Sequence, residues 1–527
     1  MKKLMSVLFL ITFFIPAQRA VSQAAQPSFT LFLEEITYED WPGIHSFAYG
    51  TWDERWIIVC GRVDGLHAFL PPNPFPVSDA NHFIRMVDPQ TGEQWNKSIY
   101  DLPLEIANQL RSTNPQYFQR DNYLYVIGGY GKDSLSGDKI TFPSLIAIDL
   151  EMLSDVLINE LDPAPAFRKL DDTIFQVTGG EIEVFNDRVF LFGGHVFTGD
   201  YTKPASPSFT QKYTNEVRTF LLGDDGITLS VSDIDILYDS ILFHRRDLNF
   251  EPVLYAGEEK GLAAYSGVFQ YDGDFPWLYD IYFHADGTYA QNEECEHRFN
   301  NYTCPVMNVF DSASNTMYTT FFGGISQYYF DETDSVIDSD LNIPFVNDIT
   351  TMVRYADGSC EQIVMPLSFD GLLGSNAIFQ LNDEMAHYDN NIIKLHVLDG
   401  EYEAGYIYGG IQAFIPNFTP SIASNKLYKV KINYTPPEPA EIAGYPDRYI
   451  KVFPNPVRDR IDVQNNSADI ISEIMLTNSY GKIVYHSEKD IGFAETEKIS
   501  VAGFANGIYF LQVIMKHQTV IKKIVVE

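Results

Sequence analysis

RVFLFGGH, at Arg188 to His195, is one of six related segments spread along the chain. In each one a run of strand-forming apolar residues ends in Gly-Gly or a near equivalent. The other members are WIIVCGR (Trp56 to Arg62), YLYVIGGY (Tyr123 to Tyr130), MYTTFFGG (Met317 to Gly324), GYIYGGI (Gly405 to Ile411) and the degenerate GLAAYSGVF (Gly261 to Phe269). One such segment would indicate only a turn after a strand, whereas six in register predict a structural repeat.

A second strand is expected after each repeat, beyond a loop of variable length. The segments that carry it are HFIRMVDPQTGEQW, PSLIAIDLEML, NEVRTFLLGDDG, WLYDIYFHADG, NDITTMVRYADG and NKLYKVKINY. This order resembles the kelch repeat, in which a strand ending in Gly-Gly is followed by a strand and an acidic turn. The resemblance implies an all-β fold, a six-bladed kelch-like β-propeller with four strands in each blade.

The spacing of the repeats departs from the kelch pattern. Successive glycines are 57 to 86 residues apart, longer than the spacing of about 50 that is typical of kelch units. We expect the extra residues to form loops on one face of the ring.

The ends of the repeat region predict how the ring closes. The last repeat ends at Tyr434 without an outer strand, and SFTLFLEEITY, Ser28 to Tyr38, is a strand without a partner. Pairing the two would remove an open sheet edge. The propeller is therefore expected over residues 28–435.

The C-terminal segment, residues 445–527, has a separate pattern. Its ordered landmarks are Pro454, Asn455 and Pro456 in YIKVFPNPVRDRIDV, Gly481 and Lys482 in LTNSYGKIVYH, Gly507, Ile508 and Tyr509 in FANGIYFLQVI, and Lys522 and Lys523. The succession resembles the type A C-terminal sorting domain of the Bacteroidota type IX secretion system. The resemblance implies a small β-sandwich and a partner, the type IX secretion machinery.

The N-terminus agrees with export. Lys2 and Lys3 precede an apolar run from Leu4 to Ile15, followed by small residues at Ala20 and Ser22, which is typical of a signal peptide over residues 1–22. A Pro-rich linker, residues 436–444, precedes the sorting segment. The chain is expected to pass through the periplasm and to end as a secreted or outer-surface protein, with no transmembrane segment.

Charge excludes one class of partner. The formal net charge is −35, and residues 445–527 contain as many acidic as basic side chains, so the acidity belongs to residues 1–444. A nucleic-acid-binding surface would require a basic patch. No nucleic acid is expected as a partner.

The four cysteines suggest one disulfide. Cys295 and Cys304 lie in the polar stretch ECEHRFNNYTC, and an oxidising compartment favours a bridge between them. A metal site with His297 is the alternative, and no metal site is predicted. Cys60 is expected to be a small buried apolar residue, and Cys360 has no predicted role.

Residues after the Gly-Gly strands are the candidate ligand contacts, because these loops gather at one mouth of a kelch-like ring. The candidates share polar or aromatic character and are Arg62, Asp64, His67, Tyr130, His195, His244, Arg245, Arg246, Gln327 and Gln412. Arg and His side chains at a channel mouth suit an anionic sugar, a carboxylate or a peptide. For any single residue, packing against a neighbouring blade is the competing interpretation.

The predicted function is an extracellular binding or adhesion module for a protein or glycan. An enzyme is not favoured, because the GxSxG, HExxH and P-loop patterns are missing from the sequence. The alternative is a carbohydrate-active enzyme with carboxylates at the channel mouth, and a structural surface component is a further possibility. No catalytic residue and no cofactor is predicted, although calcium could bind the turns at Asp224 and Asp225 or at Asp272 and Asp274.

Overall fold

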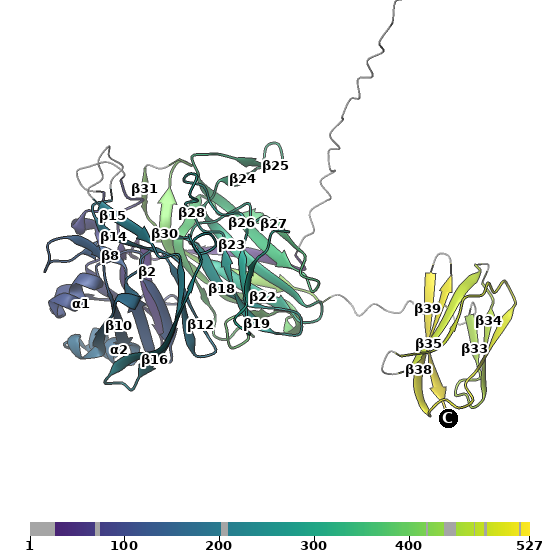
Figure 1. Cartoon of the computed structure of the whole chain (residues 1–527). Coiled ribbons are helices and arrows are strands. Elements are labelled where there is room, and N and C mark those ends of the chain that lie inside the picture. Colours follow the sequence, from purple (N-terminus) through teal and green to yellow (C-terminus); the bar gives the residue numbers. More distant parts are fainter. Residues whose placement is uncertain are drawn as a thin grey trace, which may run out of the picture. The chain divides into compact units, whose positions relative to one another are not determined.

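The computed structural model describes residues 27–68, 74–201, 209–417, 420–436, 450–467, 469–478, 482–515 and 518–527. The chain divides into two compact units, Met1–Thr435 and Pro436–Glu527. Strands dominate both units, so the predicted all-β class is confirmed (Figure 1). The predicted signal peptide, nearly all of the predicted linker and Gly481 lie outside the described residues.

Six sheets, each built on four main antiparallel strands, form the main body of the described part of the first unit. In order from the innermost strand, sheet 1 is β2 (His45–Trp52), β3 (Arg55–Arg62), β4 (Phe83–Val87) and β5 (Gln94–Ser98), and sheet 2 is β6 (Gln116–Arg120), β7 (Tyr123–Ile127), β10 (Ser144–Asp149) and β11 (Phe167–Asp171). Sheet 3 is β12 (Glu181–Phe185), β13 (Arg188–Phe192), β16 (Glu216–Asp224) and β17 (Leu229–Tyr238), and sheet 4 is β18 (Asn249–Leu254), β19 (Lys260–Tyr265), β20 (Ile281–His284) and β21 (Tyr289–Gln291). Sheet 5 is β22 (Val306–Asp311), β23 (Thr316–Ile325), β26 (Phe345–Arg354) and β27 (Cys360–Ser368), and sheet 6 is β28 (Leu372–Leu381), β30 (Gly400–Ala413), β32 (Leu427–Tyr434) and β1 (Phe29–Ile36). The six related sequence segments all fall on the second strand of a sheet.

The sheets form a closed ring. Each innermost strand contacts the innermost strands of the sheets before and after it, and β28 contacts β2. Six apolar clusters fill the spaces between successive sheets. On β7, for example, Leu124 and Val126 pack toward sheet 1 while Tyr125 and Ile127 pack toward sheet 3. Both faces of these strands are buried, which explains why the repeats read as continuous apolar runs. A ring of six four-stranded sheets is the architecture of a six-bladed β-propeller.

Closure of the ring follows the prediction. β1 pairs antiparallel with β32, from Phe29 opposite Tyr434 to Ile36 opposite Leu427. The N-terminal strand is thus the outermost strand of sheet 6, which confirms the predicted strand exchange.

The paired glycines join neighbouring sheets. Gly129 donates its N–H to the Val177 carbonyl at 2.9 Å, and Gly194 donates to the Arg245 carbonyl at 2.8 Å. Each acceptor lies on the loop that leads into the next sheet. A Cβ on Gly193 would stand 2.5 Å from the Arg245 oxygen. Glycine is required because the two backbones approach too closely for a side chain.

The long steps between repeats contain additional structure. β8 (Tyr130–Lys132) and β9 (Lys139–Thr141) from sheet 2 join β14 (His195–Gly199) and β15 (Phe209–Tyr213) from sheet 3 in an extra sheet, and β24 (Tyr328–Asp331) pairs with β25 (Val336–Ser339). Short strands β29 (Ile393–Lys394) and β31 (Ser421–Ala423) add to sheets 5 and 6. Short 3₁₀ turns occur at Val77–Asp79, Ile99–Asp101, Ala164–Ala166, Thr173–Phe175 and Leu395–Val397.

Two helices were not predicted: α1 (Leu104–Gln109) and α2 (Leu150–Asn159). The segment PSLIAIDLEML leaves its strand at Asp149, whose carboxylate accepts the Met152 N–H at 3.0 Å. An aspartate in this position caps a helix. The strand expected over the whole segment therefore covers only its first half.

The disulfide differs from the predicted one. Cys295 is bonded to Cys360, with Cα atoms 5.8 Å apart, and Cys304 is a buried free thiol. The predicted Cys295–Cys304 bridge is therefore wrong. Cys295 follows sheet 4 and Cys360 begins β27 of sheet 5, so the bond links two sheets that the sequence keeps 65 residues apart. His297 is fully buried, and its Nδ1 lies 3.0 Å from Asp280 Oδ1.

The second unit contains two sheets around one apolar core. Its strands are β33 (Ile450–Phe453), β34 (Arg460–Asn465) and β37 (Thr496–Ser500) in one sheet, and β36 (Ile483–Ser487), β35 (Ile471–Asn478), β38 (Gly507–Met515) and β39 (Gln518–Val526) in the other. β35 and β36 form the hairpin predicted from LTNSYGKIVYH.

Candidate functional site

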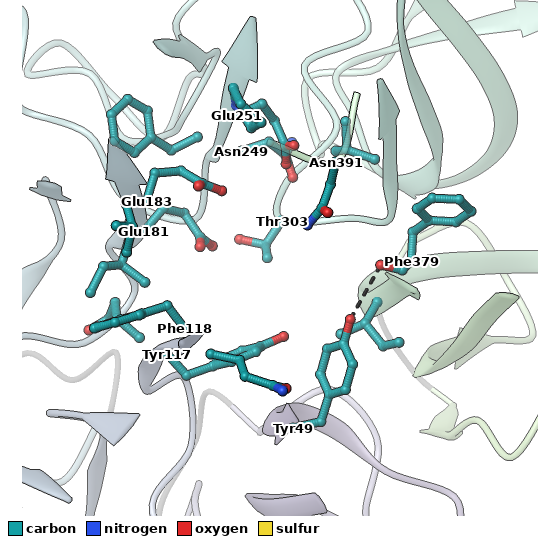
Figure 2. A pocket seen from close by; sticks show the side chains of 18 of the residues that line it. Tyr49, Tyr117, Phe118, Glu181, Glu183, Asn249, Glu251, Thr303, Phe379 and Asn391 are labelled. Atoms are coloured by element: carbon teal, nitrogen blue, oxygen red, sulfur yellow. Dashed lines mark hydrogen bonds between the residues drawn. The ribbon is translucent and has the colours of Figure 1, made fainter. Parts of the chain in front are cut away.

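A central cavity of about 920 Å³ lies between the innermost strands of the ring. All six of these strands, β2, β6, β12, β18, β22 and β28, contribute to its lining (Figure 2). Its volume is in the range of small-molecule sites, which is about 300–1,000 Å³. The cavity is therefore the leading candidate for a ligand site.

Two glutamates on β12 point into the cavity. Glu181 and Glu183 are separated by one residue, so the alternation of the strand places both on the same face (Figure 2). Burial raises the pKa of each carboxyl to about 8, and the charge of Glu183 adds to the rise at Glu181. Near neutral pH a large fraction of both groups is therefore protonated.

A third glutamate, Glu251 on β18, faces the same cavity (Figure 2). Burial, with a contribution from Glu183, raises its pKa well above the usual value. Asn308 Nδ2 donates to Glu251 Oε2 at 2.8 Å. The amide thus holds the carboxyl in place.

Four lining residues have a buried amide oxygen without a hydrogen-bond partner within the protein: Asn114, Gln116, Asn308 and Asn390. The side chains of Asn308 and Gln116 are only 7% and 2% exposed. A buried acceptor without a partner is costly, so these atoms mark positions for a water or a ligand donor.

Aromatic side chains form another part of the lining. Tyr49 donates its hydroxyl hydrogen to Gln380 Oε1 at 3.0 Å, with the Phe379 carbonyl 3.3 Å away (Figure 2). The Tyr117 ring meets the Tyr49 ring edge to face, with centroids 5.6 Å apart. The cavity thus combines carboxyls and amides with aromatic surface.

A series of five backbone hydrogen bonds lines one part of the cavity. It joins one residue from each innermost strand or from the segment before it: Ser46, Asn114, Gly179, Asp247, Thr303 and Asn376. Five of them have φ between 49° and 64°, a conformation that Gly, Asn and Asp tolerate best. N–H to carbonyl bonds of 2.7–3.3 Å join successive members from Ser46 to Asn376. The sequence analysis did not identify this recurrent position.

Six of the ten predicted site residues come together on the loops beyond the Gly-Gly strands. With two unpredicted aromatic residues they form the loop cluster: Arg62, Asp64, His67, Phe75, Tyr130, His195, Tyr201 and Arg246. Arg62 makes a bidentate ion pair with Asp64, both bonds at 2.7 Å. His67 stacks on Phe75 with ring centroids 4.5 Å apart, and Phe75 meets Tyr130 edge to face at 5.4 Å.

His195 and Arg246 complete the loop cluster. Arg246 Nη1 lies 3.1 Å from His195 Nδ1, and its guanidinium stands 4.3 Å above the Phe269 ring centroid. Burial, then the Arg246 charge, lowers the pKa of His195 well below its usual value, so the imidazole is neutral. Tyr201 accepts from Arg246 at 3.1 Å and contacts the His67 ring, which links the two halves of the cluster.

Arg245 and His244 hold neighbouring backbone and rings together. Arg245 is fully buried and donates to the carbonyls of Leu242, Ser266 and Tyr279 at 2.5–2.9 Å. The His244 ring stacks on the rings of Tyr213 and Tyr271, with centroid-to-centroid distances of 4.0 and 3.9 Å. The surroundings of Arg245 indicate a structural role, in contrast to the predicted ligand contact.

Gln327 and Gln412 lie on segments that do not contribute to the loop cluster. Gln327 precedes β24 and donates its backbone N–H to Asn300 Oδ1 at 2.9 Å. Gln412 lies on β30 of sheet 6, opposite Ile422. The loop cluster, by contrast, is built from segments of sheets 1 to 4.

The acidic turn at Asp224, proposed for calcium, has protein partners. Asp224 accepts from Tyr125 at 2.8 Å and pairs with Arg168. Among the described residues one group of three possible metal ligands lies close together, Glu473, His486 and Glu488 in the second unit. Two of these three are exposed.

The cavity glutamates were missed by the sequence analysis. In GGEIEVF, Glu181 and Glu183 alternate with Ile182 and Val184 directly after a Gly-Gly pair. Charged residues alternating within an inner strand could have indicated a polar channel face. The analysis instead concentrated on the residues that follow the Gly-Gly strands.

Comparison with known proteins identifies the C-terminal unit. Residues 451–527 match the family described as "Secretion system C-terminal sorting domain". This match confirms the predicted resemblance to the type IX sorting domain, and the chain is exported to the cell surface or secreted. No helix in the described residues is long and apolar enough to cross a membrane.

The remaining comparisons concern the whole chain. No curated protein matches it. A solved structure titled "Structure of YjhT" is similar to it with a TM-score of 0.39 and 10% sequence identity, over 73% of this chain and 97% of that chain. A likeness of this extent carries no argument about function.

Proposed function

We propose that this exported protein is an extracellular binding module and that its kelch-like ring holds a ligand in the central cavity. The observation that carries the proposal is the cavity itself, about 920 Å³ in volume and lined by side chains from all six innermost strands. A ring scaffold does not determine a function, so the proposal rests on the lining.

The predicted contact residues enter the proposal as a second part of the site. Arg246 of the loop cluster is next to Asp247, which lines the cavity, and the Arg246 Nε to Asp247 Oδ2 distance is 3.5 Å. A protein or glycan partner that contacts the loop cluster could thereby reach the cavity lining. Of the predicted set, Arg62, His67, Tyr130, His195 and Arg246 are the proposed contributors.

Binding should be tested with the mature protein on immobilised glycans and on envelope proteins from the native cell. The variant Glu251→Gln should weaken capture, and the variant Glu93→Gln, an equal charge change at an exposed site outside the cavity lining, should not. Equal capture by the two variants would contradict a cavity site.

The second candidate function is a carbohydrate-active enzyme. It is favoured by the two glutamates that share one face of β12 in the cavity lining, Glu181 and Glu183. Burial raises the pKa of each to about 8, and a protonated carboxyl near neutral pH can act as a general acid. Sustained product release from a polysaccharide panel, abolished by Glu183→Gln, would support catalysis. Binding without turnover would leave the module as the better description.

A further inference from the structure

We propose that the ligand of the central cavity is a small organic cation with several N–H donors, a primary ammonium or a guanidinium compound. This inference rests on the proposed function and specifies the chemical class of the ligand. The lining offers carboxyl and amide acceptors, and several of the donors near them are already used by the protein. A cation rich in donors would complement both the charge and the hydrogen bonding of such a surface.

The charge of the lining is the first argument. Glu181, Glu183 and Glu251 lie on two adjacent innermost strands, and Asp247 lies at the start of the second of them. Burial raises the pKa of Glu251 and Asp247 as well. Carboxyl groups held together in a partly dry space are poorly stabilised as anions, and a bound cation would relieve that cost.

The unpartnered amides are the second and independent argument. Gln116 and Asn308 belong to the cavity lining, both side chains are more than nine-tenths buried, and neither amide oxygen has a partner in the protein. Each accepts hydrogen bonds only. A ligand that supplied N–H donors would satisfy both.

The hydrogen-bond donors of the lining favour a cationic over an anionic ligand, because several of them are already engaged. Asn308 Nδ2 is engaged by Glu251 at 2.8 Å, and Asn249 Nδ2 donates to the Asn301 carbonyl at 2.8 Å. Lys260, a cation of the lining, pairs with Asp389 at 2.6 Å. An anionic ligand would therefore meet few available donors beside several carboxyls.

Aromatic surface and spacing favour an organic cation over a metal ion. Tyr49 and Tyr117 present rings to the cavity (Figure 2), and such rings attract ammonium and guanidinium groups. Within the described residues, the group of side chains close enough together to hold a metal ion lies in the second unit, outside the cavity.

Isothermal titration calorimetry on the full mature chain tests the inference. The probes are spermidine and agmatine as cations, maltotriose as a neutral sugar and calcium chloride as the metal. We expect the cations to bind, and Glu183→Gln and Glu251→Gln each to weaken binding about tenfold or more, because a hydrogen bond to a charged group is lost. Glu93→Gln serves as the matched exposed control.

A further variant addresses the amide oxygens. Gln116→Met keeps the length of the side chain but removes its acceptor, so it should weaken cation binding without removing any charge. Thermal unfolding of each variant in the absence of probe establishes that the fold is retained. If the Met variant unfolds, the Glu183→Gln and Glu251→Gln variants decide the inference on their own.

The outcomes separate this inference from the proposed function. Binding of maltotriose or calcium with no binding of either cation would overturn the cation assignment and leave a ligand-binding cavity in place. Cation binding that both glutamate variants leave unchanged would also overturn it. If no probe binds, and the capture of glycans and proteins fails as well, both the cation assignment and the proposed function are wrong.

Discussion

Gly193 stands against the carbonyl of Arg245, which lies on the loop entering the next sheet, so that a Cβ at this glycine would be 2.5 Å from the oxygen. The following N–H, that of Gly194, donates to the same carbonyl at 2.8 Å. The contact joins sheets 3 and 4 through backbone atoms alone. It gives a physical reason for the Gly-Gly ending, which recurs because the same junction recurs around the ring.

Gly193→Ala should destabilise the first unit by more than the cost of its positive φ. Gly193 has φ of 62° and Gly137 has φ of 81°, but a Cβ at Gly137 would meet nothing within 4 Å. Gly137→Ala should cost about 1–2 kcal/mol, whereas Gly193→Ala should cost at least about 1 kcal/mol more because the junction must also shift. Urea unfolding of both variants measures the difference in the free energy of unfolding. Equal losses of stability would contradict a close backbone contact at Gly193.

Stability should fall as pH rises through the cavity carboxyls. The pKa of Glu181 and of Glu183 is about 8 in the folded chain and about 4.5 as a free side chain. The folded state thus holds more protons, and the stabilisation present below about pH 4.5 is lost as the pH approaches and passes 8. We expect Glu181→Gln with Glu183→Gln to flatten the decline measured by denaturant unfolding between pH 5 and 8.

The size of that decline should be modest. The carboxyls face a cavity that contains solvent, so we expect a loss of about 1–3 kcal/mol over this range. The other ionisable groups facing them in the lining include Tyr117, Asp247, Glu251 and Lys260. A double variant with the same pH profile as the unmodified chain would show that other groups control it.

Arg245→Met should destabilise the fold strongly. The guanidinium is fully buried and donates to three carbonyls, and their loss leaves buried acceptors unpaired at a cost of about 3 kcal/mol or more. Circular dichroism during urea unfolding provides the measurement. Lys212→Met, at an exposed cation on β15, is the control, and similar midpoints for the two variants would contradict a structural role.

Peptide mapping without reduction should recover Cys295 linked to Cys360 and Cys304 as a free thiol. The bond closes a loop with a sequence separation of 65, so Cys360→Ser should cost about 4 kcal/mol by the loop-entropy relation. Cys304→Ser should leave the linked peptide intact. Recovery of a Cys295–Cys304 peptide would restore the pairing expected from sequence.

Deletion of residues 451–527 should stop export at the periplasm. The matched sorting domain lies within the second compact unit, and the six-sheet ring lies wholly within the first. The truncated chain should therefore remain folded but resist protease added to intact cells. Surface digestion equal to that of the full chain would contradict the role of the segment.

Much of the fold could be predicted because its signals are local and repeated. Runs such as YLYVIGG specify a strand and its glycine junction within a few residues, and the unpaired strand at Ser28 to Tyr38 has an apolar pattern that only another sheet could complete. Helix α2 was missed because Asp149 changes from strand end to helix cap within the same segment.

The candidate site was predicted less well because its parts come from different sheets. The residues after the Gly-Gly strands are prominent in sequence, yet many of them pair with one another, as Arg62 does with Asp64. Glu183 and Glu251 belong to ordinary-looking strands 68 positions apart. Nothing near either residue in sequence indicates that the other faces it.

The amino-acid sequence alone determined the all-β class, the sixfold repeat, the exchanged outer strand and the export segment, since each leaves a recognisable pattern within a short stretch of the chain. Only the tertiary structure decided which side chains share the cavity and that Cys295 bonds Cys360. Ring closure brings six innermost strands to one axis, and the neighbours it creates there depend on the geometry of whole sheets.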